Sequence, residues 1–289
     1  MVSDATADWL VLYATAGEGA QVQAALRQPR ARTLAGLRFL AGWLPADRQA
    51  TRRRSSRRVR LILAATGVGL ANAAYAAGVG LAAFRVRGVA SIGIAGGYAR
   101  DCWPIGAVAC GRWFGLGDAG VREGADRPAG PASNGVVRTA RKNRAGWRDL
   151  GAIGIPLAGA VASGESFNRL PARVAVTHRM LAALPSKLRP AGVLTVNACS
   201  GAPDRAAELR RRAGKMAPGF ARLPWVEDME TAGIALACLR ADRPLLSLRG
   251  ISNCAGDRDR RHWDIPGAAA AAQQALLTIV TAARESRHG

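Results

Sequence analysis

Polar and glycine-rich segments follow the apolar stretches of this chain at four places. Glu18 follows the first stretch, GIAGGY (93–98) and NACSG (197–201) follow two others, and SNCAGDRDRRHW (252–263) follows the last. The last segment places an amide and five charged side chains in one short turn. Glycine lets a ligand approach the backbone closely, and carboxylates, amides and arginines can hold its polar groups. The four segments are therefore predicted to contribute to one ligand site.

The elements that must position these segments are alternating strands and helices. Continuous apolar strands between helices indicate a largely parallel sheet covered on both faces. We therefore expect an α/β fold with three layers, α/β/α, around a central, mostly parallel (mixed) sheet. Ligands of such sheets bind at the carboxyl ends of the strands. The expected strands are 9–14, 59–66, 88–96, 107–113, 157–163, 193–197 and 244–252, and the expected helices are 70–84, 225–240 and 266–284.

The composition indicates one globular domain, because 289 residues with 49% hydrophobic side chains can bury a large core. The formal net charge of +21 comes almost wholly from arginine. The densest basic runs, 51–60 and 205–215, have no interleaved aromatic residues that could stack on bases, so nucleic acid is not an expected partner. Within the single domain 1–289, arginine-rich insertions or long loops are predicted near 24–56, 120–150 and 203–222.

The cysteines and the termini point to the cytoplasm. The five cysteines include no CxxC pair, which predicts neither a zinc site nor a disulfide framework and favours a reducing compartment. The N-terminus lacks the basic region of a signal peptide. Residues 61–84 are uncharged and long enough to cross a bilayer, but they divide into a strand-like and a helix-like part around the turn GVG. A membrane span is therefore not expected.

Several segments, taken in order, resemble the nucleoside phosphorylase/nucleosidase superfamily, and within it the futalosine hydrolase family. The segments are ATAGEGA, TGVGLANAAYA, SIGIAGGY, IGAVACGRWFGLGDAG, VEDMETAGIALACL and RGISNCAGDRDRRHWDI, which together cover about half of the chain. The resemblance implies a phosphorylase/hydrolase-like fold. It also implies cleavage of an N-ribosidic bond through a ribosyl cation-like transition state.

The resemblance assigns roles to four residues around the sugar and the nucleophile. It implies that Glu230 accepts the ribose hydroxyls and that the Met229 thioether packs against the sugar. Glu18 takes the position of the acid that orients and deprotonates the attacking water. Arg249 matches an arginine that lines the nucleophile site. From the residues alone, Glu230 also fits a surface acid near a helix N-terminus, Glu18 a loop acid and Arg249 a snorkelling edge arginine.

Asn253, together with Gly96 and Gly97, is expected to bind the base. Its amide NH₂ can donate hydrogen bonds to N7 and O6 of a 6-oxopurine, both of which are acceptors. Relatives that cleave 6-aminopurines often carry an aspartic acid here, so the asparagine favours hypoxanthine as the leaving base. An asparagine can also read N6 and N7 of adenine, or merely form a turn after a strand, and these alternatives stay open.

The charged turn that follows is expected to contact the rest of the substrate. Asp257 is predicted to bind substrate, to help orient Asn253, or to pair with Arg258 or Arg260 and fix the turn. Arg258, Arg260 or His262 is expected to meet the benzoate tail of futalosine, because arginine binds carboxylates bidentately. A purely structural salt-bridge network is the alternative.

The nucleophile is inferred from the residue at one position of the third strand. Phosphorolytic relatives hold phosphate there with an arginine just before the glycine turn, whereas this chain has Ser91. Hydrolysis is therefore favoured over phosphorolysis. The segment CSGAPD lacks the phenylalanine with which some relatives stack on the base. Tyr98, Trp225 or Phe167 is expected to supply that stacking instead.

The expected function is hydrolysis of the N-ribosidic bond of a 6-oxopurine nucleoside, with futalosine cleaved to hypoxanthine and dehypoxanthine futalosine in menaquinone biosynthesis. The first alternative is a phosphorylase or nucleosidase for another purine nucleoside. The second is a catalytically silent protein that binds nucleosides or nucleic acid. The expected partner is a small-molecule nucleoside. A homo-oligomer is expected, and no cofactor, metal, nucleic acid or membrane partner is.

Overall fold

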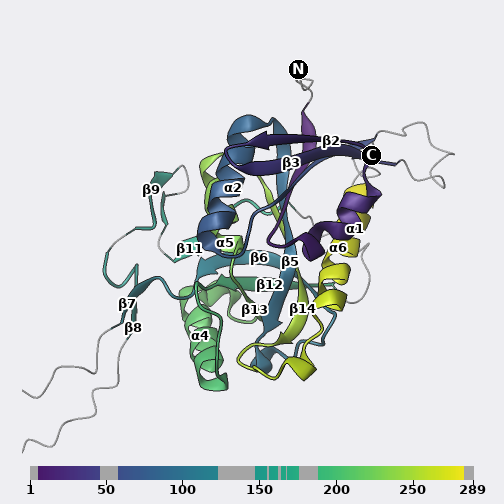
Figure 1. Ribbon diagram of the computed structural model, residues 1–289. Coiled ribbons are helices and arrows are strands. Elements are labelled where there is room, and N and C mark those ends of the chain that lie inside the picture. Colours follow the sequence, from purple (N-terminus) through teal and green to yellow (C-terminus); the bar gives the residue numbers. More distant parts are fainter. Residues whose placement is uncertain are drawn as a thin grey trace, which may run out of the picture.

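The structure of the protein is a computed structural model that describes residues 6–45, 58–122, 147–154, 156–161, 164–166, 168–175 and 188–282. Figure 1 shows a central sheet with helices on either side of it. The predicted three-layer α/β/α arrangement is confirmed.

One large mixed sheet runs through the molecule. β5 pairs in parallel with β1 and β14, and β1 pairs in parallel with β4. β13 pairs with both β12 and β5, and β14 pairs with both β5 and β6, so these strands and the β6–β12 pair close into a ring. The strands of this sheet are β1 (Ala7–Tyr13), β2 (Arg27–Leu34), β3 (Leu37–Leu44), β4 (Val59–Ala65), β5 (Val86–Gly97), β6 (Val108–Leu116), β11 (Arg169–Leu170), β12 (Leu188–Thr195), β13 (Trp225–Asp228) and β14 (Leu245–Cys254).

Helices cover both faces of this sheet. Alternate residues of β1 divide the core into two layers, because successive side chains of a strand point to opposite faces. Leu10 and Leu12 join the core beneath α2 and α5, whereas Val11 and Tyr13 join the core beneath α1 and α6. Burial on both faces explains why the strand sequences are continuously apolar. The helices are α1 (Ala16–Ala25), α2 (Leu70–Ala83), α4 (Pro203–Met216), α5 (Thr231–Arg240) and α6 (Ile265–Ala282), with short 3₁₀ turns at Ala99–Asp101, Pro218–Phe220 and Arg260–His262.

Most of the predicted elements are confirmed, but one was wrong and another lies outside the main sheet. The segment 225–240 is not one helix, because Trp225–Asp228 forms β13 and α5 begins only at Thr231. Trp225 and Val226 are fully buried in the sheet between β12 and β5, and this pairing overrides the helical pattern. Of the predicted strand 157–163, Ala158–Val161 forms β9, which pairs with β10 (Gly164–Ser166) in a separate two-stranded sheet.

The described parts of the arginine-rich segments contain regular structure and are not long loops, while their being insertions stays a prediction. β2 and β3 form a hairpin that extends the main sheet from β4, and α4 occupies most of 203–222. β7 (Gly120–Arg122) pairs with β8 (Trp147–Asp149). The arginines of β2 are accommodated because it is an exposed edge strand. The rest of the predicted insertions, 46–57 and 123–146, lies outside the described residues.

The uncharged segment 61–84 divides as predicted, into β4 and the helix α2. Across the part of the chain that the structure describes, no helix combines the length and the apolar character that crossing a membrane requires.

Candidate functional site

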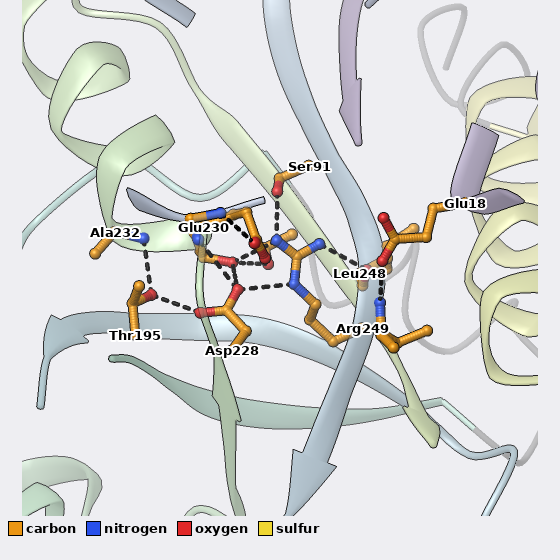
Figure 2. Close-up of polar contacts among 12 residues, drawn as sticks. Glu18, Ser91, Thr195, Asp228, Glu230, Ala232, Leu248 and Arg249 are labelled. Atoms are coloured by element: carbon orange, nitrogen blue, oxygen red, sulfur yellow. Dashed lines mark hydrogen bonds and ion pairs between the residues drawn. The ribbon is translucent and has the colours of Figure 1, made fainter. Parts of the chain in front are cut away.

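A cluster of charged and polar side chains lies between α1, α5 and the strands β5, β13 and β14. Figure 2 shows the Arg249 guanidinium in the middle of this cluster, with Glu18 on one side and Glu230 on the other. Two of the four segments singled out from the sequence reach it, namely Glu18 itself and GIAGGY, whose Ile94 amide donates to Glu18, whereas Arg249 lies three residues before SNCAGDRDRRHW. That all four segments contribute to one ligand site stays a prediction.

Arg249 on β14 is enclosed by the protein, with an exposed fraction of 1%. Its Nε donates to Asp228 Oδ2 at 2.8 Å, and one terminal nitrogen donates to the hydroxyls of Ser91 and Thr231, each at 2.8 Å. Burial lowers the pKa of Arg249, but the carboxylates of Asp228, Glu230 and Glu18 raise it by more than burial lowers it. The pKa of Arg249 therefore lies above its usual value. Arg249 is therefore a buried, permanently charged group and not the snorkelling edge residue of the alternative interpretation.

Glu18 lies in the first turn of α1 and forms a capping box with Thr15, whose backbone amide donates to Glu18 Oε2 at 2.9 Å. The other oxygen, Oε1, accepts from the Ile94 amide of β5 at 3.0 Å. A side chain at Gly93 would come within 2.8 Å of Glu18 Oε1 and 3.2 Å of an Arg249 nitrogen. The glycine thus leaves room for Glu18 and Arg249 to approach each other, and Glu18 is a fixed carboxylate, not a loop acid.

Glu230 lies in the bend between β13 and α5, next to the half-buried Met229. One carboxylate oxygen, Oε1, accepts from the Gly69 amide ahead of α2 at 2.9 Å. No described residue donates a hydrogen bond to the other oxygen. Burial, and then the charge of Asp228, raises the pKa of Glu230 to about 7, although Arg249 and the Gly69 amide lower it. Glu230 can therefore offer one carboxylate oxygen to a ligand.

Asp228, which the sequence analysis did not single out, connects these groups. Its buried carboxylate accepts from the Thr195 hydroxyl at 2.6 Å and from the Thr231 amide at 3.0 Å, as well as from Arg249. The signal that could have revealed it is an acid directly after the apolar residues of WVED, before the Met229–Glu230 pair. Because 225–240 was predicted to be one helix, Asp228 was not recognised as an acid at the end of a strand.

Asn253 and Gly96 lie side by side, because they are paired in the register of β14 and β5. The Asn253 Oδ1 accepts from the Ser252 hydroxyl at 2.8 Å, and Nδ2 donates to the Cys254 carbonyl at 2.9 Å. One Nδ2 hydrogen remains for a ligand, not the two that the predicted contact with N7 and O6 requires. The space beside Gly97 is filled by Trp103, 2.6 Å from the position of a side chain, so packing accounts for this glycine.

The charged turn after Asn253 is held mainly by its own hydrogen bonds. Asp257 pairs with His262 at 2.7 Å and accepts from the Asp259 amide at 2.8 Å, so the predicted pairing with Arg258 or Arg260 was wrong. The hydrogen bond with His262 lowers the pKa of Asp257 and raises that of His262. Arg258 lies over the Trp263 ring at 5.0 Å.

Two of the three aromatic residues considered for base stacking are enclosed in the core. Tyr98 and Trp225 have exposed fractions of 2% and 0%, and the Tyr98 hydroxyl donates to Glu227. Neither ring face is open to a base, so for these two the prediction was wrong. Phe167 lies outside the described residues.

The NACSG segment is fixed at both ends by carboxylates. Asp118 accepts from the Asn197 amide at 2.7 Å, and Glu227 accepts from the Ser200 amide at 2.7 Å. Partial burial, and then the negative charges of Glu227 and Glu230, raise the pKa of the intervening Cys199 thiol. Among the described residues, no three His, Cys, Asp or Glu side chains are arranged to hold a metal ion.

Comparison with known proteins adds to this geometry. The family model of the phosphorylase superfamily matches residues 45–284. A futalosine hydrolase of Thermus thermophilus is 32% identical over 158 residues, which cover 53% of this chain and 64% of that protein. A futalosine hydrolase of Acidothermus cellulolyticus is 42% identical over 88 residues, which cover 30% of this chain and 33% of that protein. The chain thus matches less than two thirds of the length of these relatives.

Solved structures share the fold at low sequence identity. Futalosine hydrolase of Helicobacter pylori superposes with a TM-score of 0.66 at 16% identity, covering 96% of this chain and 99% of that one. S-adenosylhomocysteine nucleosidase of Streptococcus pyogenes, in complex with 5-methylthiotubericidin, superposes with a TM-score of 0.68 at 17% identity, covering 96% and 97%. At these identities the likeness concerns the fold alone.

Proposed function

The chain belongs to the phosphorylase superfamily, and we propose that it hydrolyses the N-ribosidic bond of a 6-oxopurine nucleoside. The observation that carries this proposal is the placement of two carboxylates, Glu18 and Glu230, on either side of the buried Arg249 (Figure 2). A ribosyl cation-like transition state gains positive charge on the sugar. Carboxylates fixed in a buried site stabilise such charge far more than water does.

Each carboxylate has a separate part in the proposed reaction. The free oxygen of Glu230 accepts hydrogen bonds from the ribose hydroxyls, and the Met229 side chain packs against the sugar. Glu18 accepts a proton from the attacking water, because its oxygens are held by Thr15 and Ile94 while lone pairs remain available. Arg249 and Glu18 both face the space beside Gly93, from which the guanidinium orients the water.

The surroundings of Arg249 favour water over phosphate as the nucleophile. Ser91 stands where a phosphate-binding arginine would be, and its hydroxyl accepts from Arg249. A phosphate dianion beside this guanidinium would also approach the carboxylates of Asp228, Glu230 and Glu18, all of which act on Arg249. Their combined negative charge outweighs the one positive charge and repels a dianion, whereas neutral water is unaffected.

Asn253 supports a base that leaves as an anion. Its amide cannot supply a proton, and its free Nδ2 hydrogen can donate to N7 as negative charge develops there. Hypoxanthine carries that charge more easily than adenine does. On the similarity to futalosine hydrolases we propose futalosine as the substrate, cleaved in the cytoplasm as a step of menaquinone biosynthesis by a homo-oligomeric enzyme.

The charged turn supports a contact with the benzoate tail of that substrate. Asp257 pairs with His262 and Asp259 pairs with Arg261, so these partners are already engaged. Arg258 has no carboxylate partner among the described residues. Its guanidinium stacks on the Trp263 ring. The amide of the next residue, Asp264, donates to the Ser252 carbonyl at 2.8 Å, which holds this part of the turn beside the base-binding Asn253. Arg258 is therefore the arginine of this turn that we propose for the carboxylate.

A base-release assay tests the proposed function. Futalosine, inosine and methylthioadenosine are each incubated with the enzyme, with and without phosphate, and the base and sugar products are identified by chromatography. We expect hypoxanthine and a free sugar, with futalosine cleaved fastest and no effect of phosphate. Phosphate-dependent formation of ribose 1-phosphate would overturn the nucleophile assignment. Faster cleavage of methylthioadenosine than of either 6-oxopurine would overturn the base assignment.

A further inference from the structure

Asp228 ends β13 and holds the start of α5. Its Oδ2 accepts from the amide and the hydroxyl of Thr231, while Oδ1 accepts from the Thr195 hydroxyl. That Thr195 hydroxyl in turn accepts from the Ala232 amide at 2.9 Å. The first free amides of α5 are thus satisfied through Asp228, directly or by way of Thr195. The position of Glu230, immediately before the helix, follows from these contacts.

The same carboxylate oxygen also holds the nucleophile side of the site. Asp228 Oδ2 accepts from Arg249 Nε at 2.8 Å, in an ion pair whose two side chains have exposed fractions of 0% and 2%. A guanidinium is planar, so fixing Nε fixes the direction of the other two nitrogens. One of these reaches Ser91, and the other lies 3.2 Å from the side-chain position of Gly93, a position that is 2.8 Å from Glu18 Oε1.

We propose that Asp228 is a positioning residue, whose single buried carboxylate fixes Glu230 and Arg249 relative to each other. A consequence is that the Asp228 charge acts on the ionisation of Glu230. For the sugar-binding role of Glu230 this inference rests on the proposed function. The link between Asp228 and the charge of Glu230 does not depend on it.

Charged and titratable groups face Glu230 from several elements. Asp228 lies on β13, Arg249 on β14 and Glu18 on α1, and the Cys199 thiol follows β12. After burial, Asp228 makes the largest contribution to the raised pKa of Glu230, and Arg249 opposes it. Removing the Asp228 charge has two effects of the same sign. The repulsion between carboxylates disappears, and Arg249 is left uncompensated, so Glu230 ionises at lower pH.

The decisive experiment is a carbon-13 NMR titration of the Glu230 carboxyl group in wild type, Asp228→Asn and Glu227→Gln, with Glu230→Gln to assign the signal. Glu227 is the matched control, because it is a buried acid of the same strand that bonds to Ser200 and Tyr98 and not to Glu230 or Arg249. We expect the midpoint to fall by about 1–3 pH units in Asp228→Asn, the usual effect of one nearby charge, and to stay in place in Glu227→Gln. An unchanged midpoint in Asp228→Asn overturns the proposal.

Asp228→Glu provides the second test, and it also covers the case in which Asp228→Asn does not fold. The charge is kept but displaced by one methylene group, so the Glu230 midpoint should stay near that of wild type. The kcat should fall about 10- to 100-fold, because Glu230 and Arg249 are displaced from each other. Wild-type kcat in Asp228→Glu overturns the positioning role. Since the titration requires no turnover, a failure of the proposed nucleoside chemistry remains distinguishable from a failure of this inference.

Discussion

Replacing Glu230 by glutamine is the most direct perturbation of the site, and the structure predicts how the new amide will be oriented. The Gly69 amide donates to Glu230 Oε1, so the glutamine carbonyl oxygen has to stay on that side. The NH₂ group then faces the sugar. It presents hydrogen-bond donors where the ribose hydroxyls need acceptors, and it removes the negative charge that faces the developing cation.

The expected loss follows from these two changes. A hydrogen bond to a charged group contributes roughly 1.5–3 kcal/mol, so losing the contacts to two hydroxyls, partly replaced by water, corresponds to roughly 3 kcal/mol. This is on the order of 10²-fold in kcat/KM. The assay is steady-state release of hypoxanthine, with Glu208→Gln in α4, whose carboxylate pairs with Arg205 and Arg212 outside the site, as the control. A folded Glu230→Gln enzyme with near-normal kcat/KM would refute the sugar-binding role.

The pH dependence gives an independent check of the same residue. The pKa of Glu230 is raised to about 7, so the carboxylate that binds ribose forms only as the pH rises through that value. The kcat/KM of wild type should therefore increase through pH 7, and this rise should be absent in Glu230→Gln. The contribution of Glu230 to the free energy of unfolding changes with pH in the opposite direction to kcat/KM. A raised carboxyl pKa stabilises the fold below the unfolded-state value and loses this contribution as the pH rises through about 7. Denaturant unfolding should thus show Glu230→Gln gaining stability relative to wild type between pH 5 and pH 8.

Three further predictions concern the base, the core of the site and the tail of the substrate. Asn253→Ala should raise the activation free energy of base release by roughly 2–4 kcal/mol. Asn253→Asp should shift the preference of the enzyme toward 6-aminopurines, and an unchanged ratio of inosine to adenosine turnover would contradict that shift. Gly93→Ala places a methyl group 2.8 Å from the nearest carboxylate oxygen and should lower kcat at least about tenfold, while Gly78→Ala, with open space around it, should not. Arg258→Gln should raise the KM for futalosine about tenfold and leave inosine unaffected, with Arg261→Gln as control; equal effects on both substrates would argue against the carboxylate contact.

The sequence by itself determined the alternation of strands and helices and the edge of the sheet where the site lies. Strands such as 59–66 and 244–252 carry apolar residues on both faces because helices cover both sides of the sheet, and that pattern is visible without a structure. The rule that polar residues after parallel strands meet at one edge covered Glu18, whereas Glu230 and Arg249 were assigned to the same site only through the resemblance of their segments to the nucleosidase superfamily.

Only the tertiary structure decided the contacts that depend on strand pairing. The residues of WVED fit a helix or a strand equally well, and insertion between β12 and β5 makes them β13, which brings the Asp228 carboxylate onto Arg249. The arginine-rich 27–44 pairs with β4 as a hairpin although its own sequence resembles a loop. Local patterns record which side chains are buried, whereas the choice of partner rests on contacts between segments far apart in the chain.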